Sequence, residues 1–160
     1  MITKDYLHQL FEYKDGHLYW KLNIANNVKA GDNAGSFSNR GYKFVGINRK
    51  VYRIHRLIFL MFYGYLPKII DHKDGNKYNN KIENLREASM FENQQNRIIQ
   101  KNNKSGVKNV DWHKKSAKWR VSIQVNKKRK FIGSFKDLEL ADLVAIEARN
   151  KYHKEFARHV

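Results

Sequence analysis

The sequence predicts an α+β protein built from two structural units. Short runs of alternating apolar residues, typical of strands, are interspersed with a few helical patterns along the whole chain. The segment QKNNKS at 100–105 has almost no apolar content and is typical of a linker. We therefore expect one domain at residues 1–99, the linker, and a second domain at 106–160, which suits a chain of 160 residues.

In the first domain the patterns predict an ordered series of short elements. They are a helix at 3–12, a turn at Asp15-Gly16 leading into a strand, a loop at 23–41, two strands joined at 48–50, a buried helix at 55–63, a strand at 68–72, a strand near 84–87 and a helix from about 90 to 99. Ser89 and Glu92 have the spacing of a capping box at the start of the last helix.

In the second domain three strand-like runs precede one helix. The runs are GVKNVDW, KWRVSIQV and KRKFIGSF, and the helix is expected at about 137–153. Its apolar residues recur at helical spacing and form one stripe: Ala141, Val144, Ala145, Ala148 and Tyr152. We expect a three-stranded antiparallel sheet packed on this helix.

The charge balance indicates a polyanionic partner. Lys and Arg total 32 against 15 acidic residues, which gives a formal net charge of +17. Such self-repulsion does not help folding, so nucleic acid is the favoured explanation, although charge alone does not separate DNA from RNA. A membrane surface is disfavoured because no long amphipathic helix carries the charge on one face.

Cysteine usage and the apolar segments exclude other classes. The chain has no cysteine, which removes disulfides, thiolate nucleophiles and Cys-based zinc sites. The N-terminus has no signal-peptide core, and the longest apolar run, at 57–66, is about half a membrane span. We expect a soluble, cytoplasmic protein.

Asp71 and His72 stand together at the end of a predicted strand, within the sequence IIDHKDGNKYNN. Adjacent strand residues point to opposite faces, so only a bend into the loop brings both to one site. Asn93 falls in the first turn of the following helix, and its amide oxygen can approach Asp71 if the helix packs across the hairpin. Two oxygen donors suit Mg²⁺ or Mn²⁺, and an imidazole with a pKa near 6.5 suits a general base.

Each of these residues also has an ordinary structural explanation. An Asp-His pair is usually a surface turn, and an asparagine in a helix is usually exposed. Asn76, Asn79 and Asn80 are typical of Asx-turns. His55, at the head of a helix, is expected to be structural and is left out of the site. Only the joint register of the residues favours a functional site.

The segment IIDHKDGNKYNNKIENLREASMFEN, with the preceding YRIHRLIFLMFYG, closely resembles the HNH nuclease motif of phage and intron-encoded homing endonucleases. The resemblance covers residues 52–93 and implies a ββα-metal nuclease domain. It implies that Asp71 is a metal ligand, that His72 is the general base and that Asn93 completes the metal site. Asn84 is expected to order the loop. An asparagine in the third position favours a hard cation over Zn²⁺.

Residues of about 104–157 resemble the apetala-two type DNA-binding domain of plant ethylene-response factors. The matching pieces are SGVKNVDW, KWRVSI, KFIGSF and LADLVAIEARNKY. The resemblance implies that seven residues face DNA: Lys108, Trp112, Arg120, Ser122, Gln124, Arg129 and Phe131. Several of them depart from the plant pattern, so the expected base preference does not transfer. For Trp112, packing at the sheet edge is an equal alternative.

Together these patterns predict a DNA endonuclease that hydrolyses phosphodiester bonds with one divalent cation, Mg²⁺ or Mn²⁺. The expected partner is double-stranded DNA, with no membrane and no further small-molecule cofactor. A monomer or weak dimer acting as a site-specific homing endonuclease or nickase is the expected setting. Two alternatives stay open: a DNA-binding transcriptional regulator without cleavage activity, and an RNA-binding protein.

Overall fold

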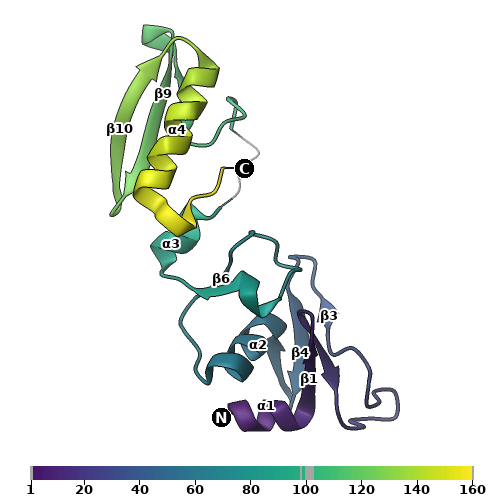
Figure 1. The fold of residues 1–160 in the computed structure, drawn as a ribbon. Helices are drawn as coiled ribbons and strands as arrows, with labels where there is room; N and C mark the ends of the chain where they lie inside the picture. The colour runs from purple at the N-terminus through teal and green to yellow at the C-terminus, as the bar shows by residue number, and fades with distance from the viewer. Residues whose placement is uncertain (1, 98, 100–102, 160) are drawn as a thin grey trace. The chain divides into compact units, whose positions relative to one another are not determined.

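The chain divides into two compact units, residues 1–88 and 89–160 (Figure 1). The computed structural model describes residues 2–97, 99 and 103–159. Helices and strands are mixed in both units, as expected for an α+β chain. The division follows Ala88 instead of the predicted linker, so the helix that carries Asn93 groups with the second unit. Part of the predicted linker, residues 100–102, lies outside the described residues.

The first unit is built from short antiparallel strands and two helices. Its described elements, in chain order, are α1 (Lys4–Leu10), β1 (Phe11–Lys14), β2 (His17–Trp20), β3 (Ser36–Phe37), β4 (Lys43–Ile47), β5 (Lys50–Arg53), α2 (Ile54–Tyr63), β6 (Ile70–His72), the 3₁₀ turn η1 (Ile82–Asn84) and β7 (Leu85–Glu87). Strands β1 and β2 pair, β3, β4 and β5 form a sheet in that order, and β6 pairs with β7.

Two tight turns fix the hairpins of this unit. Asp15 and Gly16 have φ of +48° and +83° between β1 and β2, while Asn48 and Arg49 have +50° and +60° between β4 and β5. Two consecutive positive φ angles match the right-handed twist of paired strands, and Asp, Asn and Gly adopt them most readily. Both turns confirm the sequence prediction. The short strand β3 was not predicted, because it lies in a segment rich in Asn, Gly and Ser.

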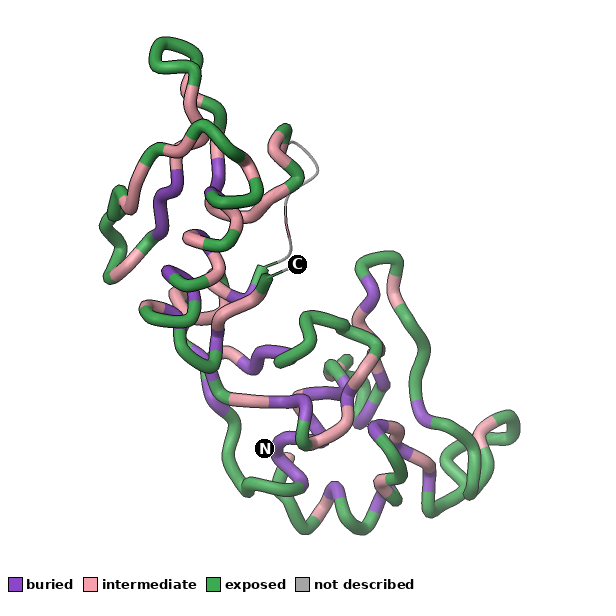
Figure 2. The backbone as a smooth tube through the Cα atoms, turned by 45° about the horizontal axis from the view of Figure 1, so that its top comes forward, coloured by how far each residue is buried: buried purple, intermediate pink, exposed green. Residues whose placement is uncertain are grey.

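Helix α2 is the centre of the first core. Ile54 and the residues from Leu57 to Met61 are buried, Phe62 and Tyr63 are exposed, and Gly64 ends the helix in the left-handed conformation with φ of +78°. The remaining core residues come from α1, from the strands and from the loop before β3: Leu7, Leu10, Phe11, Leu18, Trp20, Ala34, Val45, Ile47, Ile70 and Leu85. Figure 2 shows buried residues on the packed elements and exposed residues along the connecting loops.

His55 is the exception in this apolar helix, since only 4% of its surface is exposed. Burial, together with the charges of His72, Arg53 and Arg56, lowers the pKa of His55 to about 3. Desolvation disfavours the charged imidazole, so His55 is neutral at physiological pH. Its burial agrees with the structural role that the sequence suggested.

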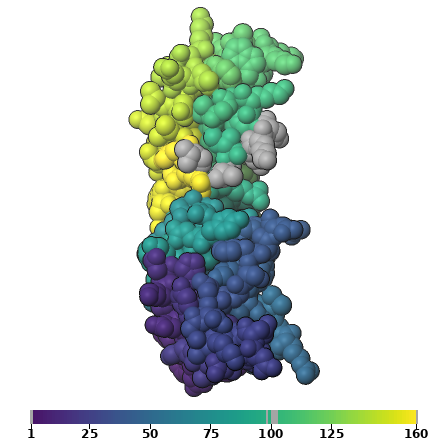
Figure 3. All heavy atoms as spheres, turned by 90° about the vertical axis from the view of Figure 1, so that its right-hand side faces the viewer, coloured from purple at the N-terminus to yellow at the C-terminus, as the bar shows by residue number. Residues whose placement is uncertain are grey.

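The second unit is a sheet covered on one side by a helix. Its described elements are α3 (Met90–Gln95), β8 (Val110–His113), the 3₁₀ turn η2 (Lys114–Ser116), β9 (Lys118–Val125), β10 (Lys128–Phe135), α4 (Leu138–His153) and the 3₁₀ turn η3 (Lys154–Phe156). The strands are antiparallel in the order β10-β9-β8. Figure 3 shows the residues of the sheet, in green, beside those of α4, in yellow.

The predicted stripe on α4 provides much of the second core. Ala141 and Ala145 are fully buried and pack with Val110 and Val121 of the sheet. The predicted capping box of α3 is confirmed, because the Ser89 hydroxyl accepts the Glu92 amide hydrogen at 3.2 Å and the Glu92 carboxylate accepts from the Ser89 amide at 2.8 Å. Helix α3 ends at Gln95, earlier than expected.

No helix within the described part of the chain is both long and apolar enough to cross a membrane.

The buried His55 predicts a loss of stability as the pH falls below 6.5. The unfolded histidine takes up a proton near pH 6.5 and the folded one only near pH 3, so acid favours the unfolded state. Between pH 6.5 and pH 5 the free energy of unfolding should fall by ~2 kcal/mol. Hydrogen exchange of the α2 amides at the two pH values measures it. His55→Phe should remove most of the loss, and His8→Gln, which changes an exposed histidine, should keep it. An equal loss in all three proteins would contradict the assignment.

Candidate active site

Asp71 and His72 lie side by side on β6, and only 5% of each residue is exposed. Strand β6 pairs with β7 so that Asp71 is opposite Arg86 and His72 is opposite Leu85. Because adjacent strand residues point to opposite faces, the two side chains have different neighbours.

The Asp71 carboxylate is held by an arginine across the hairpin. Arg86 donates from Nε at 3.0 Å and from Nη2 at 2.9 Å, both to Oδ2 of Asp71. The side chains are 11% and 6% exposed, so the pair is shielded from water. Removing one partner of such a buried pair costs about 3–5 kcal/mol, because it leaves a charge without compensation. Arg86 was not predicted, since its contact follows from the strand register.

The His72 ring is oriented by Asn80, which lies at the end of the loop. His72 Nε2 and Asn80 Oδ1 are 3.0 Å apart, and both residues are buried. An amide oxygen only accepts hydrogen bonds, so Nε2 carries the hydrogen in this pair. Asn80 had been expected only in an Asx-turn.

Two further rings from distant parts of the sequence contact His72. The His55 and His72 ring centroids are 5.1 Å apart at 64°, an edge-on contact, and Tyr42 is 5.4 Å from His55 and 6.5 Å from His72. His55 therefore adjoins the site from which the sequence excluded it. Because its pKa is low, it adds no positive charge beside His72.

The loop between β6 and β7 is organised around Asp74 and Asn84. The Asn84 amide donates to Asp74 Oδ1 at 2.9 Å and to the Asn79 carbonyl at 2.7 Å, while its oxygen accepts from the Asp74 amide at 3.0 Å. Burial raises the pKa of Asp74, but hydrogen bonds from Asn79, the Asn76 amide and Asn84 outweigh it, so the net pKa lies below its usual value. The carboxylate form of Asp74 is thus stabilised by the loop that it organises.

Asn76 and Asn79 make the local turns that their residue type predicts. The Asn76 side chain accepts from the Tyr78 amide at 3.0 Å, and the Asn79 side chain accepts from the Lys81 amide at 3.3 Å. Asn79 also donates to Asp74 Oδ2 at 2.7 Å. These turns fix the backbone conformation of the loop that leads to Asn80.

Two exposed cations flank the Tyr42 ring near His72. Arg53 Cζ and Lys77 Nζ are each 4.7 Å from the ring centroid. A cation over an aromatic face is attracted by the ring's quadrupole, which positions it without neutralising its charge. This arrangement suits a polyanion close to the buried imidazole.

The donor set near β6 suits a hard cation better than zinc. Within the described residues, no three side chains of the His, Cys, Asp and Glu types gather as a metal cluster. Asp71 supplies carboxylate oxygens, the donors that Mg²⁺ prefers, and Mg²⁺ usually keeps several waters. Structural zinc sites take four protein ligands. Asn93, the other predicted ligand, lies half-buried on α3 of the second unit.

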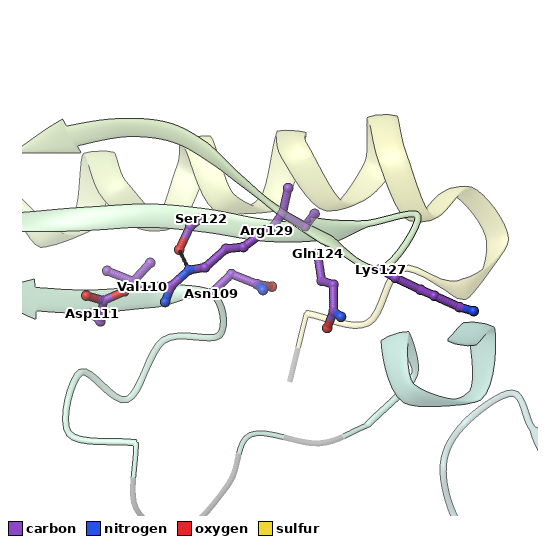
Figure 4. A pocket seen from close by; sticks show the side chains of 8 residues that line it. Asn109, Val110, Asp111, Ser122, Gln124, Lys127 and Arg129 are labelled. Atoms are coloured by element: carbon purple, nitrogen blue, oxygen red, sulfur yellow. Dashed lines mark hydrogen bonds and ion pairs between the residues drawn. The ribbon is translucent and has the colours of Figure 1, made fainter. Parts of the chain in front are cut away.

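Five of the seven predicted DNA-facing residues share the face of the second sheet that α4 does not cover. They are Arg120, Ser122, Gln124, Arg129 and Phe131, and the register places Ser122 opposite Phe131 and Gln124 opposite Arg129. Figure 4 shows Ser122, Gln124 and Arg129 around one hollow.

Lys108 and Trp112 do not join this face. Lys108 Nζ donates to the Gln95 and Arg97 carbonyls at 2.8 and 2.6 Å, and burial with nearby Arg149 and Arg158 lowers its pKa to about 8. Trp112 is opposite Trp119 with ring centroids 4.8 Å apart, so it lies on the side that α4 covers. The resemblance had implied that both face DNA, with packing at the sheet edge as the alternative for Trp112.

Comparison with known proteins identifies one family. Residues 52–95 match a family model described as HNH endonuclease. The chain is also 36% identical over 99 residues to protein 3.8 of Escherichia phage T7, an alignment that covers 59% of this chain and 79% of that protein. No solved structure matches the chain. The matched segment contains β6, the loop, β7 and α3 together with Asp71, His72, Asn84 and Asn93. The chain therefore belongs to the same family as phage T7 protein 3.8 and carries an HNH endonuclease domain at residues 52–95.

Proposed function

We propose that this protein is a DNA endonuclease that hydrolyses phosphodiester bonds at the β6–β7 site, with His72 as the general base. The observation that carries the proposal is the oriented His72 ring, held by Asn80 at 3.0 Å within the HNH domain and adjacent to Asp71. A buried imidazole that is held in one orientation is more than a surface turn requires.

His72 would take the proton of the attacking water. The contact between Nε2 and Asn80 Oδ1 holds the ring in one orientation. General-base catalysis needs a group whose pKa lies near the working pH, and imidazole meets that requirement. His55 contacts the ring while remaining neutral, so it does not compete for the proton at neutral pH.

Asp71 and Asn93 would hold the divalent cation, Mg²⁺ or Mn²⁺. HNH nucleases generally use such an ion. When bound, it supplies charge stabilisation for the scissile phosphate and the leaving oxygen. Arg86 holds the Asp71 carboxylate in place, and Asn84 would order the loop that brings Asn80 to His72.

Double-stranded DNA is the proposed substrate, in agreement with the HNH domain and the net charge of +17. Arg53 and Lys77 would contact the backbone near His72, and the apetala-two-like sheet would position the enzyme on duplex DNA. One site cuts one strand per engagement, so a monomer would nick. Site-specific homing is the proposed biological setting, in line with the phage relative.

The alternative is a DNA-binding regulator without cleavage activity, which the basic sheet favours. A regulator would shift supercoiled plasmid on a gel and leave it supercoiled in the presence of Mg²⁺ or Mn²⁺. The endonuclease converts it to nicked circles first and to linear DNA only after a second event. This assay separates the two functions.

His72→Ala should lower the cleavage rate by about 10²–10⁴-fold and leave DNA affinity nearly unchanged, because it removes the general base. Plasmid nicking and gel-shift affinity are measured on the same preparation. His8→Ala, which changes an exposed histidine of α1, serves as the matched control and should cut normally. Equal loss of cutting and binding would show that His72 is structural.

Asn80→Ala should slow cleavage by about 5- to 150-fold, because a buried hydrogen bond that loses its partner costs about 1–3 kcal/mol. The rate should be followed across pH 5–9, since the pH profile reports the imidazole. A rate loss with an unchanged profile would argue against the contact with His72. Asn76→Ala, in the same loop but without a contact to His72, should have a smaller effect.

Chelation with EDTA should abolish nicking, and added Mg²⁺ or Mn²⁺ should restore it better than Zn²⁺ does, because the proposed donors are oxygens. Asp71→Asn should need more cation for half-maximal rate. Full activity in EDTA would contradict the cation-dependent mechanism.

A further inference from the structure

A single carboxylate interrupts the most basic part of the chain. Asp111 is the sole acidic residue between Glu92 and Asp137, and it lies on β8 opposite Arg120. It shares the uncovered sheet face with Arg120 and Arg129. On a surface that binds DNA, a carboxylate repels phosphate, so its position there requires a reason.

Asp111 holds two arginines at once. Arg120 donates to Oδ2 from Nε at 3.1 Å and from Nη2 at 2.6 Å, while Arg129 donates from Nη2 to Oδ1 at 2.7 Å. Arg129 Nε also donates to the Ser122 hydroxyl at 2.8 Å, as Figure 4 shows. One carboxylate therefore orients both guanidinium groups in the absence of a partner.

The fixed arrangement leaves a defined edge of each arginine for a partner. Among the described residues, none accepts from Nη1 of Arg120 or Arg129. Their Nε and Nη2 edges, which pair well with a phosphate, are already occupied. Nη1 together with the second hydrogen of Nη2 offers two parallel donors, the pattern that matches O6 and N7 of guanine in the major groove.

Electrostatics and entropy favour the same interpretation. The pairing with Asp111 reduces two positive charges to a net charge of one, which weakens general attraction to phosphate. Holding two long side chains ahead of binding reduces the ordering cost of recognition. The arrangement thus lowers non-specific affinity for DNA and increases discrimination between bases.

The surroundings provide space and further polar groups. A hollow of about 430 Å³ beside the pair is lined by Asn109, Ser122, Gln124 and Lys127. Amide side chains pair with adenine, and a lysine contacts guanine or phosphate. A three-stranded sheet of this kind can enter a major groove.

We infer that Asp111 is a specificity-determining positioning residue, which presents Arg120 and Arg129 to guanine in duplex DNA. The inference rests on the proposed function, in which this sheet binds the substrate. It adds the class of site recognised, a duplex with guanine in the major groove, and the residue that enforces the preference.

The test uses the full-length chain carrying His72→Ala, so that DNA is bound and not cut. Selection from a randomised duplex library defines the preferred site, and Asp111→Asn, nearly identical in shape, is compared on the same library. Asp111→Asn should lower the preference at the guanine positions by about 5- to 150-fold, while affinity for unrelated duplex at low salt stays equal or rises. Replacing those guanines by 7-deazaguanine, which lacks the N7 acceptor, should weaken the parent and affect Asp111→Asn less.

Glu147→Gln is the matched control, because it removes the same charge from the exposed surface of α4. It should tighten binding to all sequences without changing the preference. If Asp111→Asn behaves like Glu147→Gln, Asp111 is only a local charge and the inference fails. If the parent shows no preference for guanine, the inference also fails. It fails equally if Arg120→Ala with Arg129→Ala leaves the salt dependence unchanged, because this sheet then does not bind DNA. Plasmid nicking by the unmodified protein tests the nuclease separately.

Discussion

The antiparallel pairing of β6 with β7 is the constraint on which the candidate site depends. Its register puts Arg86 opposite Asp71, and it returns the chain so that Asn84 can bind Asp74 across the base of the loop. A slip of one residue would turn Asp71 and His72 to the opposite faces, because side chains alternate along a strand. The loop network then carries Asn80 to His72. A few hydrogen bonds within one hairpin thus determine the positions of both the Asp71 carboxylate and the His72 imidazole.

His55 and His72 are neighbouring imidazoles in different environments. His55 and His72 are in ring contact, yet burial lowers the pKa of His55 to about 3. A protonated His55 would place a positive charge beside His72, and its low pKa keeps that charge absent near pH 7. His55 thus packs into the core and borders the site at the same time.

Carboxylates paired with arginines occur in both units and have different consequences. The Asp71–Arg86 pair is nearly buried, so removing either charge destabilises the fold. The pairs of Asp111 with Arg120 and Arg129 are partly exposed, and such pairs contribute about 0–1 kcal/mol to stability. Their effect is therefore on orientation. In a chain with 32 basic and 15 acidic residues, these few acids determine which arginines are fixed.

The sequence by itself determined most of the elements in their order, the capping box at Ser89, the turns at Asp15 and Asn48 and the HNH segment with Asp71, His72 and Asn84. These features depend on local periodicity, on backbone conformations that few residues adopt, and on the spacing of one continuous motif. Only the tertiary structure revealed the contacts of His72 with Asn80 and His55, of Asp71 with Arg86, and of Asp111 with its two arginines. It also placed Lys108 and Trp112 away from the face that the apetala-two resemblance implied. Some of these contacts join residues that are distant in the chain. The others depend on the register of paired strands and on the face of the sheet that a helix covers. Local sequence patterns specify none of these.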